Sequence, residues 1–197
     1  MSYCMVIDLK RCVGCHACDT MCKQENGTPP QVTRSKVMKK EFGEFPHVRR
    51  LSIPVLCMHC EDPACVKVCP SGATEKNKDG VVTVDKDICL GCRACMTACP
   101  YGARYFRANE TGYFGEALTP YETVKYGDKP RGVVDKCDFC RKNRLSQGHS
   151  EPACVQNCIA KARIFGQKED LQELIRRRRG FQLRPELETD PNVFYLN

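Results

Sequence analysis

Cysteine is the residue whose number and spacing could do chemistry in this chain. Cysteines make up 17 of the 197 residues, about 9 %, a level typical of disulfide-rich or metal-binding proteins. Sixteen of them fall into four groups of four in chain order: Cys12, Cys15, Cys18 and Cys22; Cys57, Cys60, Cys65 and Cys69; Cys89, Cys92, Cys95 and Cys99; and Cys137, Cys140, Cys154 and Cys158. Cys4 alone stands outside the groups. This grouping favours thiolate ligation of metal.

The spacing within the groups suits an iron–sulfur cube. The first and third groups read C-x2-C-x2-C-x3-C, the second C-x2-C-x4-C-x3-C, and the fourth C-x2-C-x13-C-x3-C. In such runs three cysteines wrap one [4Fe–4S] cube and the fourth ligates a neighbouring cube. Gly14 and Gly91 let the backbone approach the cluster, and Pro70 and Pro100 fix the backbone just after a ligand. The sequence therefore predicts four [4Fe–4S] clusters.

Disulfides, zinc and a c-type haem are the alternative uses of these cysteines. The N-terminus has no secretory signal, and close C-x2-C pairs are poor for long-range cross-linking. Zinc sites use pairs separated by longer gaps and do not need four cysteines within eleven residues. Cys12-Val13-Gly14-Cys15-His16 matches the haem string C-x-x-C-H, but the aligned repeat has Arg93 where His16 stands. Iron–sulfur ligation is favoured over all three.

The remaining candidate ligands have no partner at a ligand spacing. We interpret Cys4 as a small apolar filler. His47, His59 and His149 are each interpreted as surface residues or as neighbours of a cluster rather than as ligands. No nucleophile and base combination is found, so no catalytic residue is predicted.

The groups are related by an internal repeat. Residues 8–22 align with residues 85–99 without a gap, and residues 63–69 match residues 152–158. The order of the groups is therefore A-B-A′-B′. Only 19 residues separate Cys69 from Cys89, the compact size of a two-cluster ferredoxin, so the second and third groups should share one module.

The elements that must position the cysteines follow from local patterns. A strand is predicted at residues 5–8, a hairpin at 73–84 with its turn at 78–80, a helix at 169–179, and an extended tail at 193–196. The predicted fold class is α+β, with two ferredoxin-like modules, one nested within the other, irregular loops and a C-terminal extension. Its parts are an outer module (1–51 and 133–197), an inner module (52–108) and a surface insertion (109–132), which is either a plain loop or a partner-docking loop.

The charge balance argues against nucleic-acid binding. The formal net charge is +7, but four [4Fe–4S]²⁺ cores with four thiolates each add roughly −8, so the loaded protein is near neutral. The run 176–179 of four arginines ends the predicted helix, where basic residues are favourable. It is interpreted as solvated or partner-facing. No stretch reaches the roughly 18 apolar residues of a membrane helix.

With the four groups in place, the chain resembles the four-cluster electron-transfer (beta) subunits of molybdopterin oxidoreductases, such as dimethyl sulfoxide, polysulfide, thiosulfate and arsenate reductases. The resemblance covers essentially the whole length and is carried by Met5-Val6-Ile7-Asp8, Cys12-Val13-Gly14-Cys15, Cys22-Lys23-Gln24-Glu25-Asn26, Pro63-Ala64-Cys65-Val66 and Phe194-Tyr195-Leu196-Asn197. Ile159 departs from the family, in which Pro often follows the last ligand.

The resemblance implies how the cysteines are shared among four sites in a line. These are site I (Cys12, Cys15, Cys18 and Cys158), site II (Cys22, Cys137, Cys140 and Cys154), site III (Cys57, Cys60, Cys65 and Cys99) and site IV (Cys69, Cys89, Cys92 and Cys95). Site I would lie nearest the catalytic subunit and site IV nearest the quinol. In nitrate reductase relatives a Trp stands at the position of Cys95, and that cluster is [3Fe–4S]. The cysteine in this chain therefore implies four complete cubes.

The resemblance also implies partners and a location. The partners are a large molybdopterin catalytic subunit and a quinol-binding integral membrane subunit, with no nucleic acid and no transmembrane segment of this chain's own. The location is peripheral to a membrane, expected to be periplasmic through co-export with the catalytic subunit, with the cytoplasm as the alternative. The expected function is electron transfer without catalysis. The alternatives are the equivalent subunit of a formate dehydrogenase or hydrogenase, and a free-standing polyferredoxin.

Overall fold

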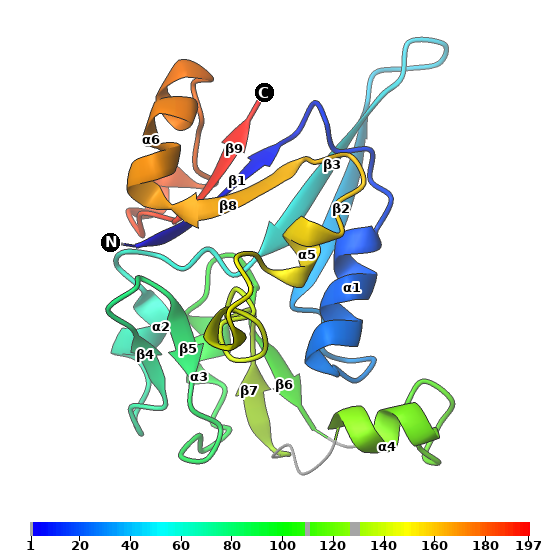
Figure 1. Ribbon diagram of the computed structural model, residues 1–197, viewed down its shortest axis with the longest axis vertical. Coiled ribbons are helices and arrows are strands. Elements are labelled where there is room, and N and C mark those ends of the chain that lie inside the picture. Colours follow the sequence, from blue (N-terminus) through cyan, green and yellow to red (C-terminus); the bar gives the residue numbers. More distant parts are fainter. Residues whose placement is uncertain (1, 109–110, 127–130) are drawn as a thin grey trace.

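The computed structural model describes residues 2–108, 111–126 and 131–197, and its elements confirm a mixed α+β fold (Figure 1). Strand β1 (Tyr3–Asp8) is the centre of a three-stranded sheet. Strand β8 (Arg163–Gln167) pairs with it antiparallel, and strand β9 (Val193–Leu196) pairs with it parallel. The predicted strand at 5–8 is therefore confirmed, and the predicted extended tail is a strand of the same sheet.

Helix α6 (Lys168–Arg177) covers one face of this sheet, and the short 3₁₀ helix η2 (Pro185–Leu187) lies in the connection from α6 to β9. The apolar side chains of α6 recur at helical spacing and pack on Cys4, Val6 and Leu196 of the sheet: Leu171, Leu174 and Ile175. The helix predicted at 169–179 is confirmed, with a start one residue earlier and an end two residues earlier. Arg178, just after its end, pairs with Asp8 at 3.2 Å.

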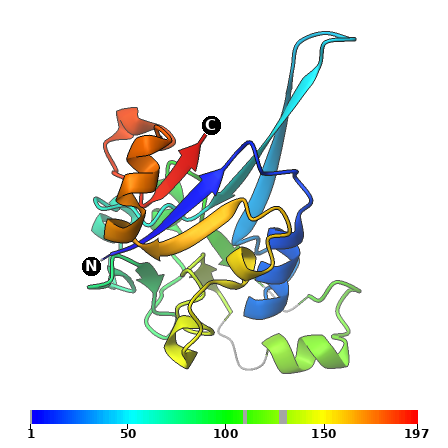
Figure 2. The ribbon, with the colours of Figure 1, turned by 45° about the horizontal axis from the view of Figure 1, so that its top comes forward.

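A long antiparallel hairpin follows the first cysteine group and was not predicted. It consists of β2 (Ser35–Phe42) and β3 (Arg49–Leu56), paired in register from Ser35 opposite Leu56 to Phe42 opposite Arg49. Figures 1 and 2 both show this hairpin, in light blue and cyan, extending far beyond the rest of the molecule.

The segment between the second and third cysteine groups forms the predicted hairpin. Strands β4 (Thr74–Lys76) and β5 (Val82–Val84) pair antiparallel across the predicted turn. Two one-turn helices lie side by side next to them, α2 (Ala64–Lys67) after Pro63 and α3 (Ala94–Thr97) within the third group. A second small ribbon pairs β6 (Tyr105–Arg107) with β7 (Val133–Asp135).

The insertion predicted at 109–132 contains a helix, α4 (Pro120–Tyr126). The Glu122 side chain of this helix accepts hydrogen bonds from the backbone N–H groups of Tyr113 and Thr119 at 2.7 and 2.8 Å, which holds the segment together. Residues 109–110 and 127–130 of the insertion lie outside the described residues. Figure 1 shows α4 at the periphery, away from the three-stranded sheet.

Helix α1 (Ala17–Asn26) packs against the one-turn helix α5 (Ala153–Gln156), which follows the 3₁₀ helix η1 (Leu145–Gln147). This contact brings the first cysteine group beside the fourth, although more than a hundred residues separate them in the sequence. Within the described ranges, no helix has the length and apolar character to cross a bilayer.

Candidate iron–sulfur sites

Site I is visible as a pocket. Three cysteines of the first group and the last cysteine of the fourth group line it together: Cys12, Cys15, Cys18 and Cys158. Arg163 of β8 and Pro54 of β3 line it too. The Sγ atom of Cys158 also accepts a hydrogen bond from the Ala162 N–H at 3.2 Å. The structure therefore brings together the four thiols that the resemblance assigns to one cluster.

The loop that carries these ligands has the same backbone in both copies of the repeat. Gly14 and Gly91 have φ values of +68° and +65°, and the following His16 and Arg93 both have φ of 63°. Left-handed backbone is easily reached by glycine. A side chain at Gly14 would also collide with Ser52 of β3, so the ligand loop lies directly on the hairpin.

Site II is supported by contacts between α1 and the fourth group. The Asn26 Nδ2 atom lies 3.6 Å from the Sγ atom of Cys22 and 3.8 Å from that of Cys140. Burial raises the pKa of the Cys22 thiol, and the nearby Cys154 and Cys140 thiols raise it further. The last cysteine of the first group thus lies among cysteines of the fourth.

Sites III and IV lie around the short helices α2 and α3. Burial raises the pKa of the Cys60 thiol to about 12, and the neighbouring Cys57, Cys65 and Cys99 thiols add to this effect. Cys99 therefore lies close enough to Cys60 of the second group to act on its thiol. For Cys69, burial is outweighed by hydrogen bonds from Thr74 and Ser71, which lower the pKa of its thiol. Helix α2 ends two residues before Cys69, and the adjacent helix α3 carries Cys95.

The donor sets fit iron–sulfur cubes better than single ions. Among the described residues, no three His, Cys, Asp or Glu side chains converge closely enough to hold one metal ion. A tetrahedral zinc site would need such convergence, with sulfur about 2.3 Å from the metal. A cube instead binds one thiolate at each of four separated irons. Its binding would also deprotonate the buried thiols, because metal ligation requires the thiolate.

Buried cations lie beside the thiols, and sequence reasoning did not find them. Arg163 is buried, with Nη1 3.5 Å from the Cys154 Sγ atom and Nη2 donating to Ser35 Oγ at 3.0 Å. Arg104 is also buried and donates to Thr74 Oγ1 at 3.1 Å. Such cations offset the negative charge of a thiolate-ligated cluster.

Two aromatic rings meet between the second and fourth groups. His59, inside the second C-x2-C loop, stacks on Phe139, inside the fourth, with ring centroids 3.8 Å apart. His59 is fully buried, and its Nδ1 atom accepts a hydrogen bond from the Val82 N–H at 3.1 Å. Of the three histidines considered in the sequence, it is the one beside cysteine ligands, whereas His47 and His149 are exposed. Its place between Cys57 and Cys60 is the local signal that could have distinguished it from the other two.

A buried ionic centre connects β7 to the two flanking segments. The Asp135 carboxylate accepts hydrogen bonds from Arg34 Nε at 2.6 Å and from Lys86 Nζ at 2.5 Å. Burial alone would raise the pKa of Asp135, but the two cations outweigh it and hold the pKa well below its usual range. Arg34 also donates to Asn26 Oδ1 at 2.9 Å, next to site II.

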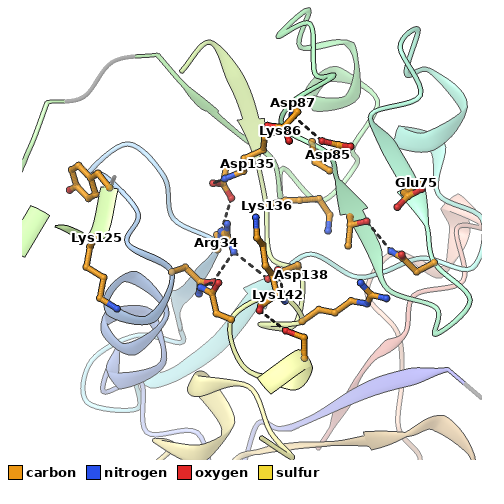
Figure 3. A pocket seen from close by; sticks show the side chains of 18 of the residues that line it. Arg34, Glu75, Asp85, Lys86, Asp87, Lys125, Asp135, Lys136, Asp138 and Lys142 are labelled. Carbon is orange, nitrogen blue, oxygen red and sulfur yellow. Dashed lines mark hydrogen bonds and ion pairs between the residues drawn. The ribbon is translucent and has the colours of Figure 1, made fainter. Parts of the chain in front are cut away.

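These residues line a pocket that is shown in Figure 3. Its labelled side chains carry both signs of charge and converge from several segments: Arg34, Glu75, Asp85, Lys86, Asp87, Lys125, Asp135, Lys136, Asp138 and Lys142. None of the described residues that line it is a cysteine. The pocket is therefore a polar cleft beside the cluster sites rather than one of them.

All seventeen cysteines lie in the described ranges, and only Cys15 and Cys92 are exposed, whereas the others are buried or half-buried. These two occupy equivalent positions in the repeat. Each has an exposed apolar neighbour, because Val13 is 63 % exposed and Leu90 is 70 % exposed. The ligand loops of sites I and IV thus carry the most exposed of the proposed ligand cysteines.

Cys4 lies outside all four sites, fully buried among Val6, Leu196 and the apolar face of α6. Replacing it in the variant Cys4→Ser should leave the iron content and the EPR spectrum unchanged. Stability should fall by about 1–3 kcal/mol, because the hydroxyl is buried in an apolar cluster. Cys4→Ala is the control, since it adds no polar group. Loss of one cluster signal in either variant would show that Cys4 is a ligand.

Comparisons with known proteins show which proteins this chain resembles. Residues 48–116 match a family described as a 4Fe-4S dicluster domain. The chain is 45 % identical to a selenate reductase subunit of Mesobacillus selenatarsenatis, over 98 % of this chain and 70 % of the relative. It is 40 % identical to the iron–sulfur subunit of an arsenate respiratory reductase of Shewanella sp., over 98 % and 94 %. It is 36 % identical to the iron–sulfur cluster-binding subunit of a menaquinone reductase of Nitratidesulfovibrio vulgaris, over 98 % and 88 %.

Proposed function

The chain belongs to the family of iron–sulfur electron-transfer subunits of molybdopterin oxidoreductases, and from this premise we propose that it relays electrons through four [4Fe–4S] clusters between a quinone-linked membrane subunit and a molybdopterin catalytic subunit. Membership makes it an electron-transfer subunit rather than a catalytic one. The clusters supply one-electron redox chemistry when bound. The chain's own residues hold them, exclude water from the inner sites and balance their charge.

The proposed ligand sets are those of sites I to IV. The observation that carries the proposal is the pocket of site I, which is lined by all four of its proposed ligands. The Asn26 contacts to Cys22 and Cys140 support the exchange of ligands between the first and fourth groups. The electrostatic effect of the Cys57, Cys65 and Cys99 thiols on Cys60 supports the equivalent exchange between the second and third groups.

The proposed nested organisation follows from this exchange. The pairing of β1 with β8 and β9, and the packing of α1 on α5, support an outer module of residues 1–51 and 133–197. The dicluster match at 48–116 includes the whole of the proposed inner module, 52–108.

The order of the clusters along the relay is proposed from the exposure of the ligand cysteines. Because Cys15 and Cys92 are the exposed ligands, sites I and IV are the ends at which electrons enter or leave, and sites II and III lie between them. We assign site I to the catalytic subunit and site IV to the membrane subunit. The relative named for menaquinone reductase supports a quinone at one end. We place the complex on the periplasmic side, reached by co-export with the catalytic subunit.

Metal analysis tests the proposal. Anaerobically purified chain should contain about 16 iron atoms and a similar amount of acid-labile sulfide, with little zinc. Purification from its native cells should also yield a large molybdopterin subunit. About 8 iron atoms would reduce the relay to two clusters. Recovery of the loaded chain without a large partner would favour the polyferredoxin alternative.

A further inference from the structure

The tip of the β2–β3 hairpin is an exposed arm. Every residue from 38 to 50, here called the arm, is exposed. It carries four large apolar side chains in the open: Met38, Phe42, Phe45 and Val48, of which Phe45 is 93 % exposed. Exposed apolar side chains gathered on one small element mark a contact surface rather than ordinary surface scatter.

The arm has no support from the rest of the described chain. Strands β2 and β3 form a sheet of two, so the outer edge of each is unpaired among the described residues. Two-stranded hairpins are marginally stable in water without a further layer. The regular pairing nevertheless continues out to Phe42 and Arg49. An element with this geometry gains its missing layer when a partner covers it.

The base of the arm lies against the ligand loop of site I. A side chain at Gly14 would meet Ser52 and the Lys39 side chain, so the two strands flank this loop. Val37 and Pro54 line the same pocket as the site I cysteines. The exposed Cys15 and the arm therefore belong to one continuous face of the molecule.

Charge indicates the kind of surface that receives the arm. Its basic residues outnumber its acidic residues by four to two: Lys39, Lys40, Arg49 and Arg50 against Glu41 and Glu44. Lys40 lies over the Phe42 ring, 5.0 Å from its centroid. Glu44 adjoins Phe45 at the tip, where a carboxylate disfavours insertion into anionic lipid. A groove with an apolar floor and an acidic rim is the complementary surface.

We propose that the arm docks into such a groove on the catalytic subunit and so holds the Cys15 loop against it. This inference rests on the proposed function, because electron exchange at site I requires that subunit to cover the exposed loop. The partner that covers the loop also meets the arm, which begins beside it. Aromatic side chains at the centre of an interface commonly carry most of its affinity.

The test is a double substitution at the arm with a matched control. In the chain with its full iron content, Phe42→Ser combined with Phe45→Ser should weaken binding to the purified catalytic subunit at least tenfold, measured by biolayer interferometry. Phe114→Ser removes an aromatic side chain that is 81 % exposed but lies in the insertion, and should leave binding unchanged. Iron content and the EPR spectrum should match the unsubstituted chain in both variants, because neither substitution touches a ligand.

Other outcomes would overturn the docking proposal. Unchanged affinity for the catalytic subunit would do so directly. If the affinity is unchanged but the variant no longer binds vesicles of anionic phospholipid, the arm contacts a lipid surface instead. If the affinity is unchanged but a dimer of this chain becomes a monomer, the arm contacts a second copy instead. If the unsubstituted chain, with all its iron, binds no catalytic subunit, the proposed function fails instead.

Discussion

The variant Cys22→Ser should lose the same EPR component as Cys140→Ser. Cys22 lies within eleven residues of Cys12, so sequence neighbourhood alone would assign it to the cluster of the first group. In the structure, however, the single side chain of Asn26 lies near the sulfur atoms of both Cys22 and Cys140. A serine at either position removes one thiolate from site II, and a cube that loses a thiolate is lost or converted to [3Fe–4S].

EPR spectra of the reduced variants provide the measurement, and Cys60→Ser is the control. That substitution removes a proposed ligand of site III and should change a different component. The signal assigned to Cys12→Ser should remain intact in Cys22→Ser. If Cys22→Ser and Cys60→Ser instead lose one common component, the first two groups share clusters in sequence order and the nested organisation is wrong.

Replacing Asp135 should lower the stability of the protein strongly, although Asp135 is not a proposed ligand. Asp135→Asn removes the carboxylate that the partly buried Arg34 and Lys86 share, so that Lys86 loses this ion pair and Arg34 keeps only its pair with Asp138 at 3.2 Å. Breaking a buried ion pair by removing one partner costs about 3–5 kcal/mol, because an uncompensated charge remains. At about 2–4 °C per kcal/mol for a protein of this size, the thermal midpoint should fall by roughly 6–20 °C. Circular dichroism under anaerobic conditions at one scan rate measures it.

The pKa of Asp135 decides at which pH the thermal midpoints should be compared. The folded-state pKa is lowered, so the stabilisation is complete above the unfolded pKa of about 4 and is lost only as the pH falls through the folded value. At neutral pH the full effect is therefore present. Asp62→Asn is the matched control, since Asp62 and Lys67 are also 2.6 Å apart but both more than half exposed. Its cost should stay below about 1 kcal/mol. Equal midpoints for both variants would contradict the assigned role of Asp135.

The sequence predicted features that depend on near neighbours. The cysteine spacings, the repeat, the hairpin around the turn at 78–80 and the helix at 169–179 each follow from residues close together in the chain. The β2–β3 hairpin was not predicted, because adjacent Lys39 and Lys40 and a proline at 54 break the alternation of a half-buried strand. Exposed strands need no such alternation. The hairpin could not be predicted because its outer residues are exposed, and exposed residues leave no apolar pattern in the sequence.

Around the sites, the sequence indicated the ligands but not the residues that surround them. Arg163 lies beside Cys154 because β8 pairs with β1, and Asp135 meets Arg34 across a hundred residues of chain. His59 and Phe139 stack although they belong to different cysteine groups. Each of these contacts depends on how distant segments meet. No spacing rule encodes them, so they became visible only in three dimensions.

The position of β1 between β8 and β9 has a consequence for biosynthesis. A ribosome makes β1 first and β9 almost a whole chain length later, at roughly 5–20 residues per second. The first strand must therefore wait unpaired for about ten seconds or longer while the middle of the chain emerges. The segment from Cys57 to Cys99 is by then already complete. Cluster insertion can begin there, while the thiols of sites I and II are still accessible to the assembly machinery. Closure of the three-stranded sheet comes last, because β9 is the last element to be made.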